Sequence, residues 1–499
     1  MEVLHLGFLQ LIDQEGPFTF HWKCKAARVF QLGFADDLLL LSKADITSIG
    51  VFKMGLDRFA RWSGLNLNVQ KSHLIISGST QGLREDMLTL LGFQEGQLPM
   101  RYLGLPLLFS RLSFLDCQLL LIKIDQRVAG WERLALSYAG RVQILKSVLT
   151  SLSVYWASTF ILPKKIIKEI EKRLQALLWK GTGNSGYPKV AWNNVCRPVE
   201  EGGQGIRDVA TLNQALMSKK LCDVIRCERT SIWVDWLYAS RLQNTSVWTD
   251  PWHPLGSLID RFPRAPNLLG LDLSTKLSSI ICGGEWRWPT ITDFECLEIT
   301  HVLPPIHGEA DNIIWRADGG QPSTKALTRL FDPPGTKIDW ASLLLGSCKI
   351  PRHLFILWMA ILGKLPTTDK PWLSHLGDCV LCDGAMENHT HLFFQCRYSR
   401  RCLSEIRKLV QFPWPNRDWA NDIDWATRKW RGKHIVNLAY RALLASCVYH
   451  IWRERNLRRF EHQQRTTTTL ASLIVNDVKQ RILSINLAYS VSTCALYRL

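Results

Sequence analysis

Apolar residues near the start of the chain follow two different spacings. Two short apolar runs, 29–34 and 38–41, enclose a polar turn and predict a β-hairpin. Apolar residues then recur every three or four positions over 46–59, which predicts one face of a helix that ends at Gly64. Residues 65–69 alternate between apolar and polar side chains, as a strand does. The order hairpin, helix, strand is therefore expected.

From about residue 112 onward the apolar spacing becomes helical. One helix is predicted to begin at Pro163, because proline is favoured at the first helical position. The face opposite its apolar stripe is basic and consists of Lys164, Lys165, Lys168, Lys172 and Arg173. Such a face is either an ordinary solvated helix surface or a surface that follows the phosphates of a nucleic acid.

The middle of the chain has no long periodic pattern. Residues 181–205 are rich in Gly and Asn and predict a connector, whereas 248–340 combine Pro, Gly and scattered Trp and predict short strands and turns. The Trp residues there are expected to pack in a core. Helical spacing returns at Ser342, and 438–460 predicts a helix near the end. Its arginines are expected on a solvated face, namely Arg453, Arg455, Arg458 and Arg459.

Composition favours a folded, basic protein. A length of 499 residues predicts roughly three domains, and it excludes a small histone-like or ribosomal type of protein. Hydrophobic residues make up 46% and charged residues 21% of the chain, which argues against global disorder. Lys and Arg total 61 against 44 Asp and Glu, so the net charge is +17. This excess favours a polyanionic partner such as nucleic acid.

The cysteine content, the apolar tracts and the N-terminal residues indicate in which cellular compartment the protein is expected. Fourteen Cys in a chain of this length are too sparse for a disulfide scaffold. No apolar tract is long enough to span a membrane, and the N-terminus lacks the basic start of a secretory signal. We expect an intracellular protein, in nucleus or cytoplasm, without a membrane partner. The motifs HExxH, GxxxxGK[ST] and GxSxG are absent, and no acidic tetrad for ribonuclease H follows residue 400.

The predicted hairpin turn carries the motif Phe34-Ala35-Asp36-Asp37. Two adjacent carboxylates in a tight turn are costly unless a positive partner joins them. Mg²⁺ is a suitable partner, because it prefers carboxylate oxygens and leaves room for substrate phosphates. The small Ala35 would let a nucleic-acid strand approach closely. The plain alternative is an ordinary Asp-Asp turn, since Asp is common in turns.

A second constellation has the pattern C-x2-C-x8-H-x4-C. Cysteines two residues apart can hold one zinc ion, and a later His and Cys complete a tetrahedral site. The alternative is a set of unrelated buried side chains, but this density in one window of an intracellular chain favours Zn²⁺. The predicted ligands are Cys379, Cys382, His391 and Cys396, with His389 and Cys402 as spare candidates.

Several short segments occur along the chain in a fixed order. They include FHWKCK at 20–25, FADD at 34–37, SGLNLN at 63–68, KS at 71–72, RYLG at 101–104, GRVQILKSVL at 140–149, YW at 155–156, ILPK at 161–164, KVAW at 189–192 and EEGGQGIR at 200–207. Together they resemble reverse transcriptases of non-LTR (LINE-type) retrotransposons of the plant kind. Residues 350–358, 391–396 and 452–456 resemble the zinc-binding domain that follows these polymerases. Because Leu-Phe-Phe follows the ligating His in that domain, His389 is the less favoured ligand.

The resemblance implies an α+β fold and an RNA-directed DNA polymerase. In that family two metal ions clamp the attacking and leaving oxygens, so Asp36 would bind Mg²⁺ with Asp37 beside it. Lys71 would neutralise charge at the leaving pyrophosphate, or else be a plain surface lysine. The primer would be positioned by Tyr102, Leu103 and Gly104, and the partners would be an RNA template and a DNA primer or target. Protein partners are not indicated.

The resemblance also implies a division into domains. These are the C-terminal part of a polymerase palm (1–111), a helical thumb-like region (112–205), a connector of unknown role (206–341), a helical zinc-binding domain (342–410) and a helical basic C-terminal region (411–499).

The family has a third metal-binding aspartate upstream of the hairpin, together with the fingers. The residues before FADD contain Asp13 as their one aspartate, and without the third carboxylate the two-metal site is incomplete. We therefore expect a truncated reverse transcriptase that is inactive alone. The alternative is a non-catalytic, zinc-containing protein that binds RNA or DNA, which Arg397, Arg400 and Arg401 beside the zinc motif support.

Overall fold

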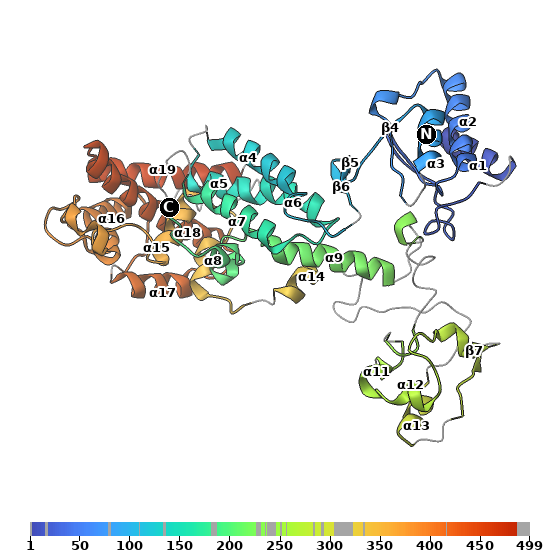
Figure 1. The fold of residues 1–499 in the computed structure, drawn as a ribbon. Coiled ribbons are helices and arrows are strands. Elements are labelled where there is room, and N and C mark those ends of the chain that lie inside the picture. Colours follow the sequence, from blue (N-terminus) through green and yellow to red (C-terminus); the bar gives the residue numbers. More distant parts are fainter. Residues whose placement is uncertain are drawn as a thin grey trace. The chain divides into compact units, whose positions relative to one another are not determined.

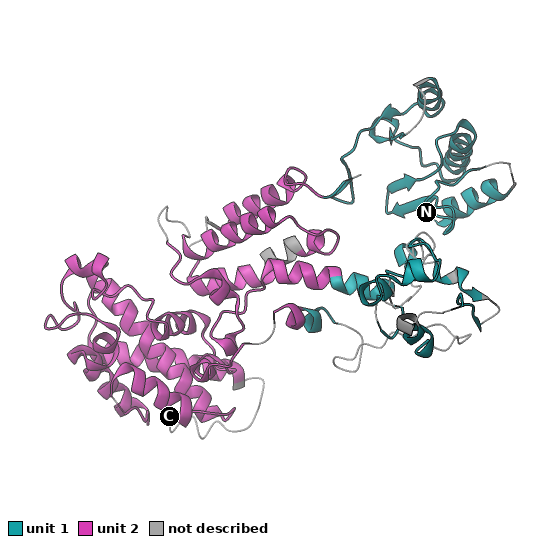
Figure 2. Ribbon diagram, turned by 60° about the horizontal axis from the view of Figure 1, so that its bottom comes forward, with its two compact units in different colours: residues 1–111, 218–327 teal, residues 112–217, 328–499 magenta. Residues whose placement is uncertain are grey.

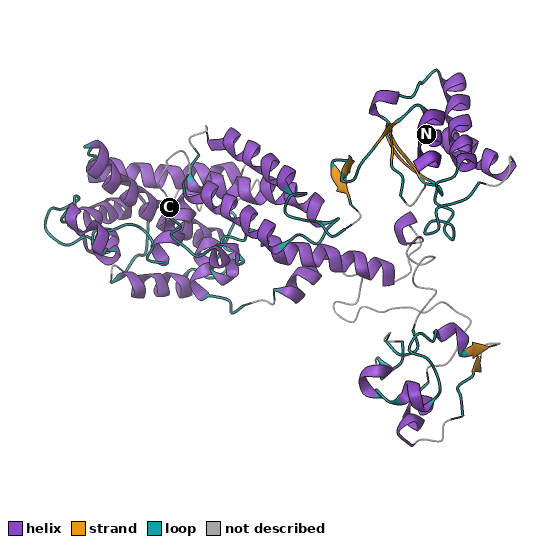
Figure 3. Cartoon of the chain, in the orientation of Figure 1, coloured by secondary structure: helices purple, strands orange, loops and turns teal. Residues whose placement is uncertain are grey.

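The computed structural model divides the chain into two compact units (Figure 2). Unit 1 comprises 1–111 and 218–327, and unit 2 comprises 112–217 and 328–499. The structure describes residues 2–14, 18–77, 81–108, 110–132, 136–180, 187–225, 231–234, 236, 246–249, 252–255, 257–282, 285–290, 294–303, 323–332, 335–415 and 417–486. Within these residues helices dominate and the sheets are small and two-stranded, which is consistent with the predicted α+β class (Figure 3).

The N-terminal part of unit 1 contains three helices and a hairpin around an aromatic core. They are α1 (Glu2–Gln14), β1 (Gln31–Phe34), β2 (Asp37–Leu40), α2 (Ile46–Ser63) and α3 (Gln81–Leu91). Phe8, Phe30 and Phe52 are buried, and the ring of Phe8 meets the other two edge-on. Helix α2 confirms the prediction from apolar spacing. The Asp45 side chain caps its start, and Gly64 ends it in the left-handed conformation.

The remaining strands of this part form two small pairs. β3 (His73–Leu74) pairs in parallel with β4 (Gln94–Glu95), and β5 (Met100–Tyr102) pairs antiparallel with β6 (Leu105–Leu107). The strand predicted over 65–69 is wrong. Leu65 is 67% exposed, and the Asn68 side chain accepts from the Lys71 backbone to start the 3₁₀ turn Val69–Lys71. Alternating apolar residues without a partner strand do not define a sheet.

A second part of unit 1 packs around tryptophan. It comprises α11 (Leu258–Arg261), α12 (Ala265–Leu268), β7 (Ile281–Cys282), β8 (Glu285–Trp286) and α13 (Phe294–His301). Trp248 is fully buried and Trp252 stacks on Trp286, so the expected tryptophan core is confirmed here. The predicted short strands occur as β7 and β8, but short helices, which were not predicted, supply much of the segment as well. A large part of the predicted connector lies outside the described residues.

The first part of unit 2 is helical, as predicted from residue 112 onward. It comprises α4 (Gln118–Glu132), α5 (Tyr138–Ile144), a π-helical turn (Leu145–Leu149), α6 (Thr150–Ala157), α7 (Lys164–Trp179), α8 (Trp192–Cys196) and the start of α9 (Val209–Ile225). Pro163 is the N-cap of α7, which confirms the predicted helix start. Apolar residues at helical spacing, including Ile166 and Ile170, are buried where α7 packs on α4 and α5.

The C-terminal part of unit 2 is a bundle of longer helices. These are α15 (Pro351–Ile361), α16 (Arg397–Leu409), α17 (Trp419–Lys429), α18 (Ile435–Asn456) and α19 (Thr467–Asn486). The short helix α14 (Thr324–Phe331) spans the point in the sequence where unit 1 ends and unit 2 resumes. Helices α16 and α18 pack on α19, and α15 packs on α18 (Figure 1). Most side chains of α18 are buried, which makes it the central helix. No helix in the described part of the chain is both long and apolar enough to cross a membrane.

Candidate metal centre and nucleic-acid interface

The four predicted zinc ligands converge in unit 2. Their ligand atoms lie within 4.8 Å of one another, and they belong to Cys379, Cys382, His391 and Cys396. The Sγ atoms of Cys379 and Cys396 are 3.9 Å apart, and Cys382 Sγ lies 3.3 Å from His391 Nε2. Tetrahedral zinc, with its usual bond lengths to sulfur and nitrogen, places ligand atoms about 3.5–3.8 Å apart. The donor types and the spacing therefore fit one zinc ion.

Local backbone structure holds these side chains together. The amides of Cys382 and Asp383 both donate to the Cys379 carbonyl, which closes a tight knuckle between the first two cysteines. His391 opens the π-helical turn His391–Gln395, and its amide donates to the Asn388 side chain. Cys396 is the N-cap of α16. The metal-binding segment therefore ends where this helix begins.

Electrostatics favour one thiolate in this cluster. A hydrogen bond with the Cys379 thiol and the backbone amides at the start of α16 lower the pKa of Cys396 to about 5. The hydrogen bond to Cys396 and burial raise the pKa of Cys379, and burial raises that of Cys382. The spare candidates His389 and Cys402 lie outside the ligand group, although both are largely enclosed.

The arginines near the end of α18 do not form a solvated face, so that prediction was wrong. Arg455 is 2% exposed and makes two-pronged hydrogen bonds to Glu387, which is fully buried. Arg459 donates to the carbonyls of Leu376 and Asp378. These backbone groups next to the zinc knuckle need donors, and the arginines supply them.

The other two arginines of this run differ from each other: Arg458 has partners, and Arg453 is exposed. The Arg458 guanidinium lies over the Tyr398 ring at 4.3 Å and bonds Glu454 at 2.8 Å. Arg453 alone of the four is exposed. The end of α18 therefore acts as a brace for the zinc segment and leaves little charge for a nucleic acid.

Helix α16 presents the basic surface closest to the zinc cluster. Its buried side carries Tyr398, Cys402 and Ile406, whereas Arg397 and Arg401 are exposed on successive turns. Neither arginine has an ion-pair partner among the residues that the structure describes. Arg400 and Lys408 are exposed as well, and Lys408 pairs with Glu405. Arg407 is exposed too, but its guanidinium donates to the Trp414 carbonyl. We call the other four exposed basic residues, Arg397, Arg400, Arg401 and Lys408, the α16 basic face.

The predicted basic face of α7 is only partly available. Lys164, Lys165 and Lys168 are exposed, but Lys172 lies 3.8 Å from Glu169. The Arg173 guanidinium bonds Asp125 at 2.7 Å and Glu169 at 2.6 Å. Arg173 therefore ties α7 to α4, and the lysines at the start of the helix form its free basic surface.

The predicted magnesium ligands sit at the tip of the β1–β2 hairpin. Asp36 and Asp37 are exposed, and Ala35 adopts a positive φ of 52° in the turn. Phe34 pairs with Asp37 to close it. Among the described residues no third potential ligand joins these two carboxylates in a metal-binding group. The geometry is that of a two-carboxylate turn.

The structure brings one predicted primer-positioning residue to this hairpin. The Tyr102 hydroxyl donates to the Leu32 carbonyl of β1 at 3.4 Å. Burial, and then the charge of Asp37, raise the pKa of Tyr102. Leu103 and Gly104 form the β5–β6 turn with positive φ angles. Lys71 is exposed in its 3₁₀ turn, and in the described part of the chain no ion pair links it to either aspartate.

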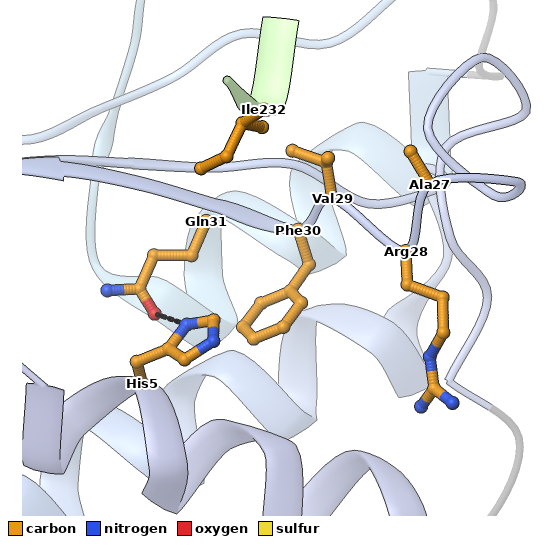
Figure 4. Close-up of a pocket in the computed structure, with 7 residues that line it drawn as sticks. All are labelled: His5, Ala27, Arg28, Val29, Phe30, Gln31 and Ile232. Carbon is orange, nitrogen blue, oxygen red and sulfur yellow. Dashed lines mark hydrogen bonds between the residues drawn. The ribbon is translucent and has the colours of Figure 1, made fainter. Parts of the chain in front are cut away.

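A small pocket lies at the start of strand β1 in unit 1 (Figure 4). Within it His5 stacks on Phe30 and bonds the Gln31 side chain at 3.2 Å. The pocket contains none of the predicted site residues. It is lined by His5, Ala27, Arg28, Val29, Phe30, Gln31 and Ile232.

Comparisons with known proteins agree with the zinc chemistry. Residues 323–402, which contain the Cys/His cluster, match the family described as zinc-binding in reverse transcriptase. The chain is 25% identical over 347 residues to an Arabidopsis thaliana protein named "Putative ribonuclease H protein", covering 58% of this chain and 56% of the relative. It is 33% identical over 82 residues to an uncharacterized mitochondrial protein of the same plant, covering 16% of this chain and 53% of the relative.

The chain thus spans about half the length of the curated relatives it matches. The matched zinc-binding family relates it to reverse transcriptases. The matched residues and the geometry of the four side chains both support Zn²⁺ as a bound metal.

Proposed function

We propose that this chain supplies the zinc-containing, nucleic-acid-binding part of a LINE-type reverse transcriptase and grips an RNA template with its DNA primer. The observation that carries the proposal is that the last zinc ligand is also the N-cap of helix α16. Cys396 is the last ligand, and Arg397 is the next residue. Zinc bound at this point would fix the first turn of α16 and with it the exposed guanidinium groups.

Chemistry supports phosphate as the target of the α16 basic face. Arginine binds phosphate oxygens through a planar, two-pronged fork, and its charge does not depend on pH in the physiological range. Arg397 and Arg401 lie one helical turn apart, both are exposed, and neither has an ion-pair partner within the described part of the chain. The first lysines of α7 offer a second, weaker surface of the same charge. Both surfaces belong to the region that the resemblance assigns to the thumb and the zinc-binding domain.

We propose that the β1–β2 hairpin contributes to a polymerase active site, and that this site also needs residues other than those described here. Asp36 and Asp37 would bind Mg²⁺ once a third carboxylate completes the two-metal site. Tyr102, held at β1, would place the primer beside them. Lys71 would neutralise charge on the leaving pyrophosphate only when a nucleotide is bound. The chain in its present form would therefore bind primer and template without extending the primer.

A second candidate is a zinc-containing RNA- or DNA-binding protein with no chemistry of its own. The same α16 basic face favours it. The ribonuclease H activity named in one relative gains no support from the described residues. Their two groups of potential metal ligands contain one carboxylate between them, that of Asp477.

Neutralising the α16 basic face is expected to weaken nucleic-acid binding. The double variant Arg397→Gln/Arg401→Gln removes two charge-assisted phosphate contacts, which should lower affinity for an RNA–DNA hybrid roughly tenfold or more. Fluorescence anisotropy with a labelled hybrid measures this. The matched control is Lys429→Gln/Lys433→Gln, which removes two exposed charges from another surface of unit 2. Equal losses in both variants would show that net charge alone is responsible.

Primer extension by the chain is expected to stay at background with Mg²⁺ and an RNA template. Among the described residues no third ligand joins the two-carboxylate turn to hold the second metal. Extension assays compare this chain with a version that carries an upstream palm strand and its aspartate. Robust extension by the chain alone, abolished in Asp36→Asn, would contradict the proposed role of the missing carboxylate.

A further inference from the structure

Three helices of unit 2 bring two histidines and one aspartate together, far from the Cys/His cluster in sequence. His353 lies on α15, His450 on α18 and Asp477 on α19. Their ligand atoms are within 4.8 Å of one another. Asp477 Oδ2 is 3.0 Å from His450 Nε2 and 3.4 Å from His353 Nε2. All three helices pack together through α18, so the bundle itself fixes this geometry.

The spacing of these atoms matches a metal site. Tetrahedral zinc with its usual bonds to imidazole nitrogen and carboxylate oxygen separates neighbouring ligand atoms by about 3.3 Å. The two measured separations lie on either side of that value. Imidazole with carboxylate is also a ligand set that zinc accepts readily.

Hydrogen bonding alone leaves this cluster poorly satisfied. His353 and His450 are 0% and 3% exposed, and the Nδ1 atom of each is buried without a hydrogen-bond partner in the described residues. Both Nε2 atoms point at one carboxylate oxygen, which also receives the Arg352 guanidinium at 3.2 Å. Three nitrogens therefore meet a single oxygen, and the Arg352 Nε also lies 3.4 Å from His353 Nε2. A cation between the rings and the carboxylate would use the Nε2 lone pairs in place of the Arg352 guanidinium, and the two Nδ1–H groups would then need water as an acceptor.

We propose that His353, His450 and Asp477 form a second zinc site, with a water molecule as the fourth ligand. Asp477 is 24% exposed, so solvent reaches the site from its side. Burial of both rings favours their neutral form. Neutral imidazole is the form that binds metal. The ion would tie α19 to the two helices that carry the histidines.

The charge of Arg352 predicts how tightly this site binds. Its guanidinium shares the Asp477 oxygen and repels a cation placed there. Arg453 also lies close enough to act on His450. The second site is therefore expected to be weaker than the Cys/His cluster, which offers zinc four protein ligands. Arg352→Gln is expected to raise the zinc affinity of the second site. A purely structural role of His353, His450 and Asp477 does not predict this rise.

Metal titration of the full chain tests this proposal. The wild type should bind two zinc ions per chain, and His450→Gln should bind one. Loss of a ligand should weaken the second ion by more than the roughly 10–100-fold that loss of an outer-shell partner causes. Cobalt substitution separates the two sites, because only the Cys/His cluster gives a thiolate-to-cobalt charge-transfer band. That band should persist in His450→Gln and disappear in Cys396→Ser.

Asp477→Asn provides a second variant in case His450→Gln does not fold, because its side chain is partly exposed. It too should lose the second ion and keep the charge-transfer band. A wild type that binds one zinc, with His450→Gln and Asp477→Asn unchanged, would overturn the proposal. An Arg352→Gln variant with no gain in affinity for the second ion would also count against it.

Discussion

Replacing Cys396 with serine is expected to empty the Cys/His cluster and unfold the zinc segment. A serine hydroxyl stays protonated near neutral pH and is a poor zinc ligand, so one of four bonds is lost. Structural zinc supplies about 10–16 kcal/mol in small zinc domains, so its loss should open the segment that carries the four ligands. Cys379→Ser should behave in the same way. Zinc content by elemental analysis and limited proteolysis of residues 371–396 measure both effects.

Cys402→Ser is the matched control for this variant. Cys402 lies on the same helix as the last ligand and is fully buried, but it stands outside the ligand group. It should lose some stability through burial of a hydroxyl and keep its zinc. Unchanged metal content in both Cys379→Ser and Cys396→Ser would eliminate the proposed site. Equal zinc loss in Cys402→Ser would mean that general unfolding explains the result.

Replacing Arg455 with methionine is expected to lower the free energy of unfolding by about 3–5 kcal/mol. The substitution leaves the buried Glu387 carboxylate with Arg459, 3.6 Å away, as its remaining charge partner, and removing the closer partner of a buried pair is costly. Urea unfolding of unit 2, followed by tryptophan fluorescence, measures the loss. Arg453→Gln is the control, because Arg453 is exposed two residues earlier, and it should change stability by about 0.5 kcal/mol or less.

The double variant Arg455→Met/Glu387→Leu separates the ion pair from simple packing. Removing both charges avoids the uncompensated carboxylate, so much of the lost stability should return. A double variant whose destabilisation equals the sum of the two single changes would show that the residues act independently. A single variant as stable as Arg453→Gln would contradict the brace between α18 and the zinc segment.

Local patterns in the sequence predicted local features of the structure. Apolar spacing identified α2 and α7, and turn chemistry identified the β1–β2 hairpin, because these depend on neighbours within a few residues. The zinc pattern was readable for the same reason, since all four side chains lie within eighteen residues. The predicted strand at 65–69 failed because a strand depends on a partner that sequence alternation cannot supply.

Features built from distant residues were not visible in the sequence. Arg455 looked like one of a row of solvated charges, yet its partner Glu387 is 68 positions away. The cluster of His353, His450 and Asp477 has no short motif, because three helices contribute one residue each. The signal that could have flagged Arg455 is the apolar character of α18 on nearly all sides, which leaves little solvated face.

The salt dependence of binding tests the proposed grip on nucleic acid most directly. Affinity for an RNA–DNA hybrid would be measured over a range of salt concentrations for the zinc-loaded wild type and for Arg397→Gln/Arg401→Gln. Each lost phosphate contact makes the slope of log K against log salt shallower by about 1. We expect a steep wild-type slope and a variant slope shallower by about 2. A flat wild-type response, or identical slopes, would contradict binding through the α16 basic face.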